Sequence, residues 1–89
     1  MSDEPVPELI FPCEYPLKVI GKDEDNFLEF VRELVSRHVP GLPYEAFIPR
    51  ASRAGTYLSV SVTFIAESRA QVDALYQELG QHRRILVAM

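Results

Sequence analysis

The sequence predicts an α+β domain in which two helices cover one face of a four-stranded antiparallel sheet. Three observations predict this class. Residues 55–66 alternate between apolar and polar positions, as a strand with one buried face does. Residues 27–38 and 69–79 repeat apolar side chains at the spacing of amphipathic helices. Three shorter apolar stretches supply the remaining strands.

The strand at residues 55–66 has the most regular pattern in the chain. Its apolar face consists of Leu58, Val60, Val62, Phe64 and Ala66. Its other face consists of Tyr57, Ser59, Ser61, Thr63 and Ile65. Antiparallel sheets commonly bury one face and leave the other to solvent, so we expect one helix-covered face and one open face.

Three further strands are expected. The first runs through residues 15–20, with Leu17 and Val19 inward and Gly21 ending it. The second is residues 43–50, and Pro49 places it at an edge of the sheet because proline has no N–H to donate. The last strand is residues 85–89.

The first helix is expected from Phe27 to His38, followed by the stop signal Pro40-Gly41. Asn26 and Glu29 have the spacing of a capping box, and Asp25 is an alternative N-cap.

The second helix carries a signal at each end. Ser68 is the expected N-cap and Gln71 completes its capping box. Gly80 is the expected residue just past the C-terminus.

The resulting order β-α-β-β-α-β predicts a ferredoxin-like fold with strand order 4-1-3-2. We expect a single domain at residues 9–89. Residues 1–8 are acidic and proline-rich, which predicts a disordered tail.

The overall composition excludes several classes of function. The net charge is −4, from nine Lys and Arg against thirteen Asp and Glu, which argues against nucleic-acid binding. The single cysteine, Cys13, cannot form an internal disulfide, and no signal peptide or membrane-spanning run precedes the domain. We therefore expect a cytoplasmic protein that does not enter a membrane.

Four stretches resemble the YbeD-like family of small uncharacterised bacterial proteins. They are residues 15–21, 37–41, 52–63 and 71–79, in this order and spacing. The resemblance spans residues 9–89 and implies a βαββαβ domain similar to the ACT-type domains that bind small effectors. The family has no established activity and no defined site residues, so the resemblance supplies no catalytic assignment; we expect no cofactor.

The candidate binding residues lie on the open face and in the turn before it: Arg53, Tyr57, Ser59, Ser61 and Thr63. Small hydroxyls suit a packing surface, for the N-terminal segment, another protomer or a different protein. An RNA-recognition domain of the same element order stacks bases on aromatic residues, and Tyr57 is the only aromatic residue among these.

The loop before the first helix is where an ACT-type domain would hold its ligand. Asp23, Glu24 and Asp25 would repel an effector's carboxylate there, which leaves a cationic ligand or a metal ion as the alternative. Cys13, His38 and His82 lack the spacing of a metal site, so we predict no metal. Arg50, Arg53, Arg83 and Arg84 form the one basic grouping, read as solvated surface or as a docking patch.

The sequence therefore favours a non-enzymatic regulatory or protein-interaction module that acts through its sheet face or edge. An ACT-type sensor of amino acids or other metabolites is the alternative, ahead of RNA binding or an enzyme. The expected partners are an unidentified protein and, through the last strand or the open face, a second copy in a weak homodimer.

Overall fold

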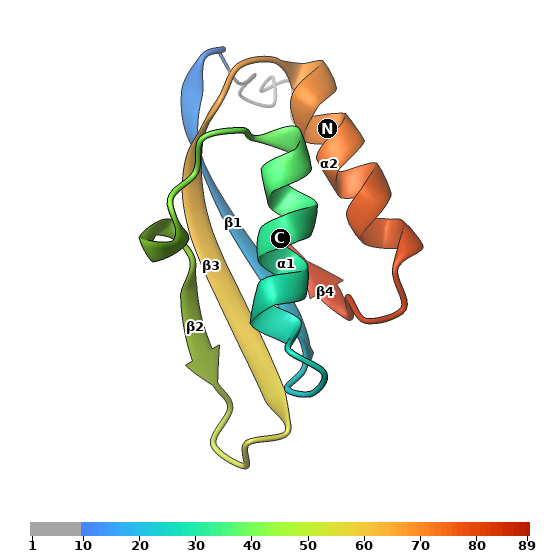
Figure 1. The fold of residues 1–89 in the computed structure, drawn as a ribbon. Coiled ribbons are helices and arrows are strands. Elements are labelled where there is room, and N and C mark those ends of the chain that lie inside the picture. Colours follow the sequence, from blue (N-terminus) through green and yellow to red (C-terminus); the bar gives the residue numbers. More distant parts are fainter. Residues whose placement is uncertain (1–9) are drawn as a thin grey trace, which may run out of the picture.

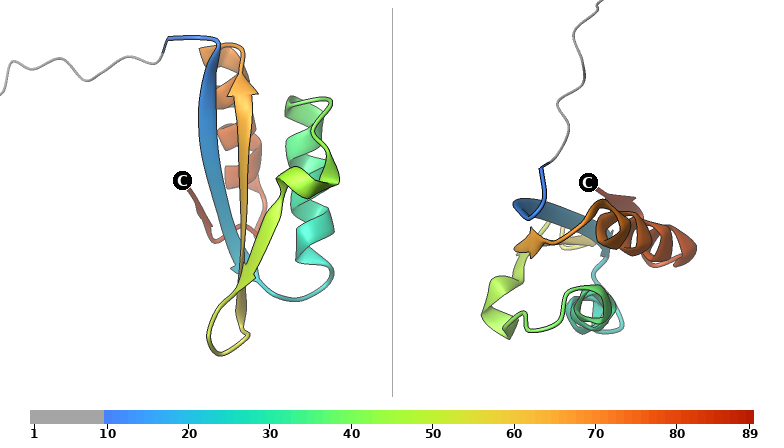
Figure 2. Two further views of the ribbon diagram at one scale, coloured as in Figure 1. Left: turned by 90° about the vertical axis from the view of Figure 1, so that its left-hand side faces the viewer. Right: turned by 90° about the horizontal axis from the view of Figure 1, so that it is seen from above.

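A computed structural model describes residues 10–89, so the predicted tail at residues 1–8 lies outside the described residues. The elements are β1 (Cys13–Lys22), α1 (Phe27–His38), the 3-10 turn η1 (Tyr44–Ala46), β2 (Ile48–Ala51), β3 (Tyr57–Ala66), α2 (Arg69–Gln81) and β4 (Val87–Ala88). The strands form one antiparallel sheet in the order β2-β3-β1-β4. Both helices lie on one side of it (Figures 1 and 2). The predicted ferredoxin-like fold and strand order are confirmed.

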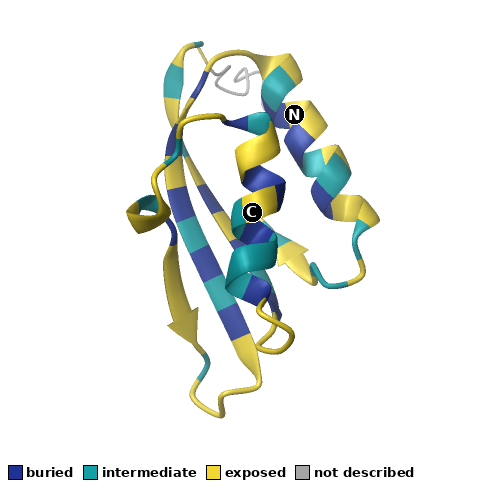
Figure 3. Cartoon of the chain, viewed as in Figure 1, coloured by how far each residue is buried: buried dark blue, intermediate teal, exposed yellow. Residues whose placement is uncertain are grey.

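The core lies between the sheet and the two helices. The five residues predicted for the inner face of β3 are all buried, as are Leu17 and Val19 of β1. Figure 3 shows this alternation of burial along β3. The helices contribute Phe27, Val31, Leu34 and Val35 from α1 and Val72, Leu75 and Leu79 from α2. Burying such a side chain stabilises the fold by about 1.5–3 kcal/mol, so the core fixes which sheet face remains open.

Gly21 does not end β1, contrary to the prediction. The strand continues to Lys22, which pairs with Tyr57. A Cβ atom at Gly21 would lie 2.4 Å from both the Phe27 ring and the Arg84 carbonyl oxygen. Glycine is therefore required here because a ring and a backbone group approach the strand closely, and not because the strand turns.

The capping box predicted for α1 does not form. Asn26 is the N-cap residue, but its φ of 58° is left-handed and its side chain makes no capping hydrogen bond. Asp25 is also left-handed, with a φ of 51°. The Arg84 guanidinium donates hydrogen bonds to the carbonyl oxygens of Glu24, at 2.5 Å, and Asp25, at 2.8 Å. A residue distant in sequence thus stabilises the loop.

The N-cap of α2 is confirmed, because the Ser68 hydroxyl accepts a hydrogen bond from the Gln71 N–H at 3.1 Å. The Gln71 side chain accepts from the N–H of Glu67, one residue before the cap. Gly80 was predicted to follow the helix, but α2 runs through Gln81 and His82 is its C-cap. Gly80 therefore lies within the helix.

The two edge strands are shorter than predicted. Residues 44–46 form the 3-10 turn, so β2 begins only at Ile48, and Pro49 lies in this edge strand as expected. The other edge strand, β4, is confined to Val87–Ala88. Reciprocal backbone hydrogen bonds between Lys18 and Met89 extend its contact with β1. The described part of the chain contains no helix long and apolar enough to cross a membrane.

Candidate functional site: the open sheet face

The strand register determines which side chains share the open face. Directly opposed residues of an antiparallel pair point to the same side of the sheet. Ser61 lies between Ile48 of β2 and Lys18 of β1. Ser59 lies between Arg50 of β2 and Ile20 of β1. We use the name open face for Glu14, Pro16, Lys18, Ile20, Lys22, Ile48, Arg50, Tyr57, Ser59, Ser61, Thr63, Ile65, Val87 and Met89.

Exposed apolar side chains are concentrated on the open face. Eight large hydrophobic residues are exposed among residues 10–89, and five of them belong to this face: Ile48, Tyr57, Ile65, Val87 and Met89. Their exposed fractions range from 43% to 59%. Apolar groups gathered on one face are a usual mark of a binding surface.

The middle of the open face is hollowed. One hollow of about 290 Å³ is bounded by Ile20, Arg50, Tyr57 and Ser59, together with Ala51 and Ser52. A second hollow of the same volume lies over Lys18, Ser61, Thr63 and Met89, with Pro16, Leu17 and Val62. The hollows lie over small side chains of β3, Ser59 in the first and Ser61 and Thr63 in the second. The Ser59 hydroxyl donates to the Arg50 carbonyl oxygen at 3.3 Å, so it is already engaged.

Four of the five candidate residues follow one another along β3. These four are Tyr57, Ser59, Ser61 and Thr63, which bound the two hollows. Arg53 is separate from them, exposed in the turn between β2 and β3. The Ser52 hydroxyl in that turn accepts a hydrogen bond from the Tyr57 N–H at 3.0 Å. Whether these residues bind a partner stays a prediction.

The open face is basic although the chain is acidic. It carries Lys18, Lys22 and Arg50 against the single acid Glu14, whereas the whole chain has a net charge of −4. All four side chains are exposed. Among residues 10–89 the other Asp and Glu residues lie outside this face, which therefore offers a partner a positive charge.

A further hollow, distinct from these two, lies at the loop between β1 and α1. It has a volume of about 310 Å³ and is lined by Lys22, Glu24, Arg83, Arg84 and Leu86. The Arg84 guanidinium lies 4.7 Å from the Phe30 ring centre, which fixes its position beside the loop. Sequence reasoning considered only the acidic residues of this loop. It did not place Arg83 and Arg84 beside the loop, because they are far from it in sequence.

The basic grouping predicted from sequence is divided between two places. Arg50 belongs to the open face, whereas Arg83 and Arg84 line the hollow at the loop. Arg53 lies in the turn after β2, so the first pair belongs to one edge strand. Arg83 and Arg84 lie in the connection between α2 and β4, the strand at the other edge. The two pairs do not form a single docking patch.

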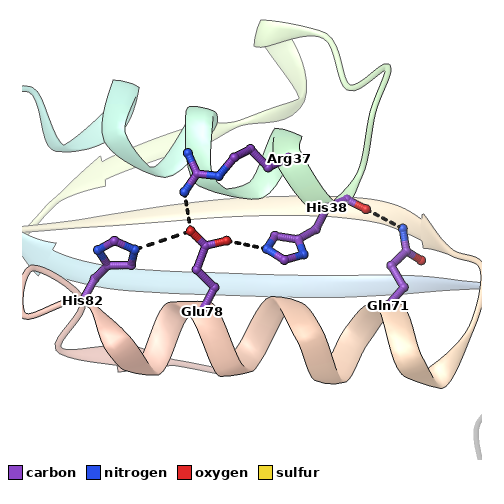
Figure 4. Close-up of polar contacts among 5 residues, drawn as sticks. All are labelled: Arg37, His38, Gln71, Glu78 and His82. Carbon is purple, nitrogen blue, oxygen red and sulfur yellow. Dashed lines mark hydrogen bonds and ion pairs between the residues drawn. The ribbon is translucent and has the colours of Figure 1, made fainter.

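Glu78 connects the two helices through a polar cluster that sequence reasoning missed (Figure 4). Its carboxylate contacts the Arg37 guanidinium, His38 Nε2 at 2.5 Å and His82 Nε2 at 3.5 Å. The hydrogen bonds from Arg37 and then from His38 lower the pKa of Glu78 to about 2. Gln71 supports the cluster by donating to the His38 carbonyl oxygen at 2.8 Å.

The Glu78 cluster is suited to joining helices. His38, the last residue of α1, is half-buried and contacts Glu78 of the neighbouring helix. The one local signal for the cluster was the Glu78–His82 spacing within α2; the contacts with α1 join residues about forty positions apart. No group of three or more His, Cys, Asp or Glu residues among residues 10–89 could hold a metal ion.

Comparison with known proteins identifies similar chains. Residues 7–89 match the model of a family described as a protein of unknown function, DUF493. The chain is 35% identical to the UPF0250 protein NE1487 of Nitrosomonas europaea, with both chains covered completely. It is 40% identical to a UPF0250 protein of Ectopseudomonas mendocina, over 94% of this chain and 92% of the other.

A solved structure has the same fold. The solution structure of protein HP0495 from H. pylori matches all of this chain and 93% of its own, with a TM-score of 0.69 and 19% identity. Similarity at this level of identity concerns the fold alone.

Proposed function

Because the chain belongs to the DUF493, or UPF0250, family of unknown function, as its resemblance to YbeD-like proteins predicted, we propose its function from its geometry. It is a cytoplasmic, non-enzymatic protein-interaction module that binds a partner protein through the open face. The observation that carries this proposal is that, of the eight large hydrophobic residues exposed among residues 10–89, five lie on that face.

The two faces of the sheet explain why binding would be favourable. The helices remove the inner face from water, but no segment among residues 10–89 does so for Ile48, Tyr57 or Ile65. Removing apolar surface from water contributes roughly 25 cal/mol per Å² before the costs of association. A partner that covered these side chains would therefore gain affinity from the same effect that holds α1 and α2 in place.

The decisive experiment compares partner capture by matched variants in an extract of the source cell. The double variant Ile48→Ser with Ile65→Ser removes apolar groups from the open face. The control, Tyr44→Ser with Leu86→Ser, removes exposed apolar groups from elsewhere. Circular dichroism melting checks that all chains fold. We expect the control to retain the partner of the wild-type chain and the face variant to lose it; equal capture by both would contradict the proposal.

A second function, ACT-type sensing of an amino acid, is supported by the hollow at the loop after β1. Lys22 and Arg83 offer charges for a carboxylate, and Glu24 offers one for an ammonium group. A ligand at a hundred times its dissociation constant stabilises the native state by about 2.7 kcal/mol. Thermal-shift screening of the common amino acids tests this function. A shift that Arg83→Gln abolishes would favour the sensor, and a screen without any shift would count against it.

A further inference from the structure

We propose that the partner presents an acidic amphipathic helix, which lies along β3 on the open face. This inference rests on the proposed function, because it names what that surface binds. It follows from the backbone hydrogen bonding of the bound segment and from the dimensions and charge of the face.

Hydrogen bonding favours a helix over an extended segment. A strand laid across a sheet face would leave its N–H and C=O groups unpaired, whereas a helix satisfies them internally. Strand addition at the sheet edges is also hindered. Pro49 lies in the edge strand β2, and Pro16 lies in the part of β1 that β4 does not cover. Neither proline has an N–H to donate to an added strand.

The dimensions of the face match those of a helix. Ser59, Ser61 and Thr63 form a floor of small side chains along β3. Larger side chains of β1 stand along one side of the floor, and Ile48 and Arg50 of β2 stand beside Ser61 and Ser59 on the other. The two rows are about 10 Å apart, since each neighbouring strand is about 4.8 Å away. A helix with its side chains is about 10–12 Å across.

The length of the floor sets the length of the helix. Tyr57 and Ile65 stand at its two ends, and their separation in sequence corresponds to about 27 Å of strand. A helix of about 18 residues covers this distance. Its apolar stripe would contact Ile20 of β1 and Ile48 of β2 as well as these two residues.

The charge of the face selects an acidic helix. Lys18 and Arg50 stand on opposite sides of the floor, Lys22 lies near one end, and Glu14 is the only Asp or Glu that residues 10–89 place on the face. Glutamate or aspartate residues flanking the apolar stripe would meet these cations. The open face of a second copy carries the same positive charges, so charge disfavours face-to-face pairing of two copies.

The test uses synthetic peptides of about 18 residues, long enough to cover the floor. One has leucines at the helical spacing flanked by glutamates. A second has the same leucines flanked by lysines, and a third has the glutamates but serines in place of leucines. Fluorescence anisotropy measures affinity, and NMR shifts locate the contact. We expect the first peptide to bind, with shifts at Ser59, Ser61 and Thr63, and the other two to bind at least about tenfold more weakly.

Charge reversal then tests the assigned cations. Lys18→Glu with Arg50→Glu should weaken binding of the acidic peptide by about tenfold or more and strengthen binding of the lysine peptide. The matched control is Arg69→Glu with Gln77→Glu and Gln81→Glu, which makes the same change of charge at exposed positions of α2, outside the open face, and it should bind as the wild-type chain does. Raising the salt concentration should weaken the wild-type complex without any change of sequence.

Failure of this inference is distinguishable from failure of the proposed function. The inference is overturned if the acidic peptide does not bind, if both charged peptides bind equally, or if face and control reversals act alike. It is also overturned if a short single-stranded RNA binds the open face more tightly than the acidic peptide. The Ile48→Ser and Ile65→Ser capture experiment judges the interaction surface itself, whatever the partner's charge.

Discussion

Gly21 is the residue whose role sequence reasoning misjudged most clearly. A Cβ there would meet the Phe27 ring and the Arg84 carbonyl oxygen at 2.4 Å. We expect Gly21→Ala to lower the free energy of unfolding by about 1–3 kcal/mol, because an overpacked core forces its neighbours to shift. Gly80→Ala is the control: its Cβ meets nothing within 4 Å, and alanine favours a helix by up to about 1 kcal/mol. Urea denaturation should show that Gly21→Ala lowers the free energy of unfolding and that Gly80→Ala raises it. Changes of the same sign would contradict the assigned role of Gly21.

Glu78 is the residue whose protonation should affect stability most directly. Its pKa falls from 4.5 to about 2 in the folded chain, so the folded state favours the ionised carboxylate. The resulting stabilisation is present above pH 4.5 and is lost as the pH falls toward 2. We expect Glu78→Gln to lower the free energy of unfolding by about 1 kcal/mol at pH 7 and to reduce the loss of stability on acidification. Melting temperatures at pH 7, 5 and 3 provide the measurement.

The control for Glu78 is Glu33→Gln, since Glu33 is exposed on the other helix. Its melting profile should follow that of the wild-type chain. If Glu78→Gln and Glu33→Gln gave the same pH dependence, the cluster between the helices would not contribute to acid sensitivity.

Among the elements, α2 is the one whose start was predicted correctly in detail. The Ser68 hydroxyl caps the Gln71 N–H, a contact set by three-residue spacing alone. We expect Ser68→Ala to destabilise the chain by about 1 kcal/mol, as loss of an N-cap usually does. Ser36→Ala, at an exposed position inside α1, should be neutral or slightly stabilising. Chemical denaturation of both variants measures the difference; equal effects would show that the cap contributes nothing.

Elements with a strong local pattern were predictable, and those governed by distant contacts were not. The alternation along β3 and the apolar stripe of α1 reflect burial, which the sequence records directly. The start of α1 depends instead on Arg84, a residue some sixty positions from the loop it contacts. The Glu78 cluster likewise joins two helices across the fold. For the same reason, sequence showed the alternation of the open face but not the register that places Arg50 of β2 beside Ser59.

At the scale of the whole molecule, the uneven distribution of charge determines how copies should interact. The weak homodimer expected from the sequence, if formed through the open face, would bring Lys18, Lys22 and Arg50 of two copies together. Salt screens such repulsion over about 10 Å at 0.1 M. We expect sedimentation to show monomer at low salt and an increasing dimer fraction as salt is raised, the opposite of the trend for an acidic helix on the same face. A dimer that is strongest at low salt would instead place oppositely charged surfaces in contact and would exclude face-to-face pairing.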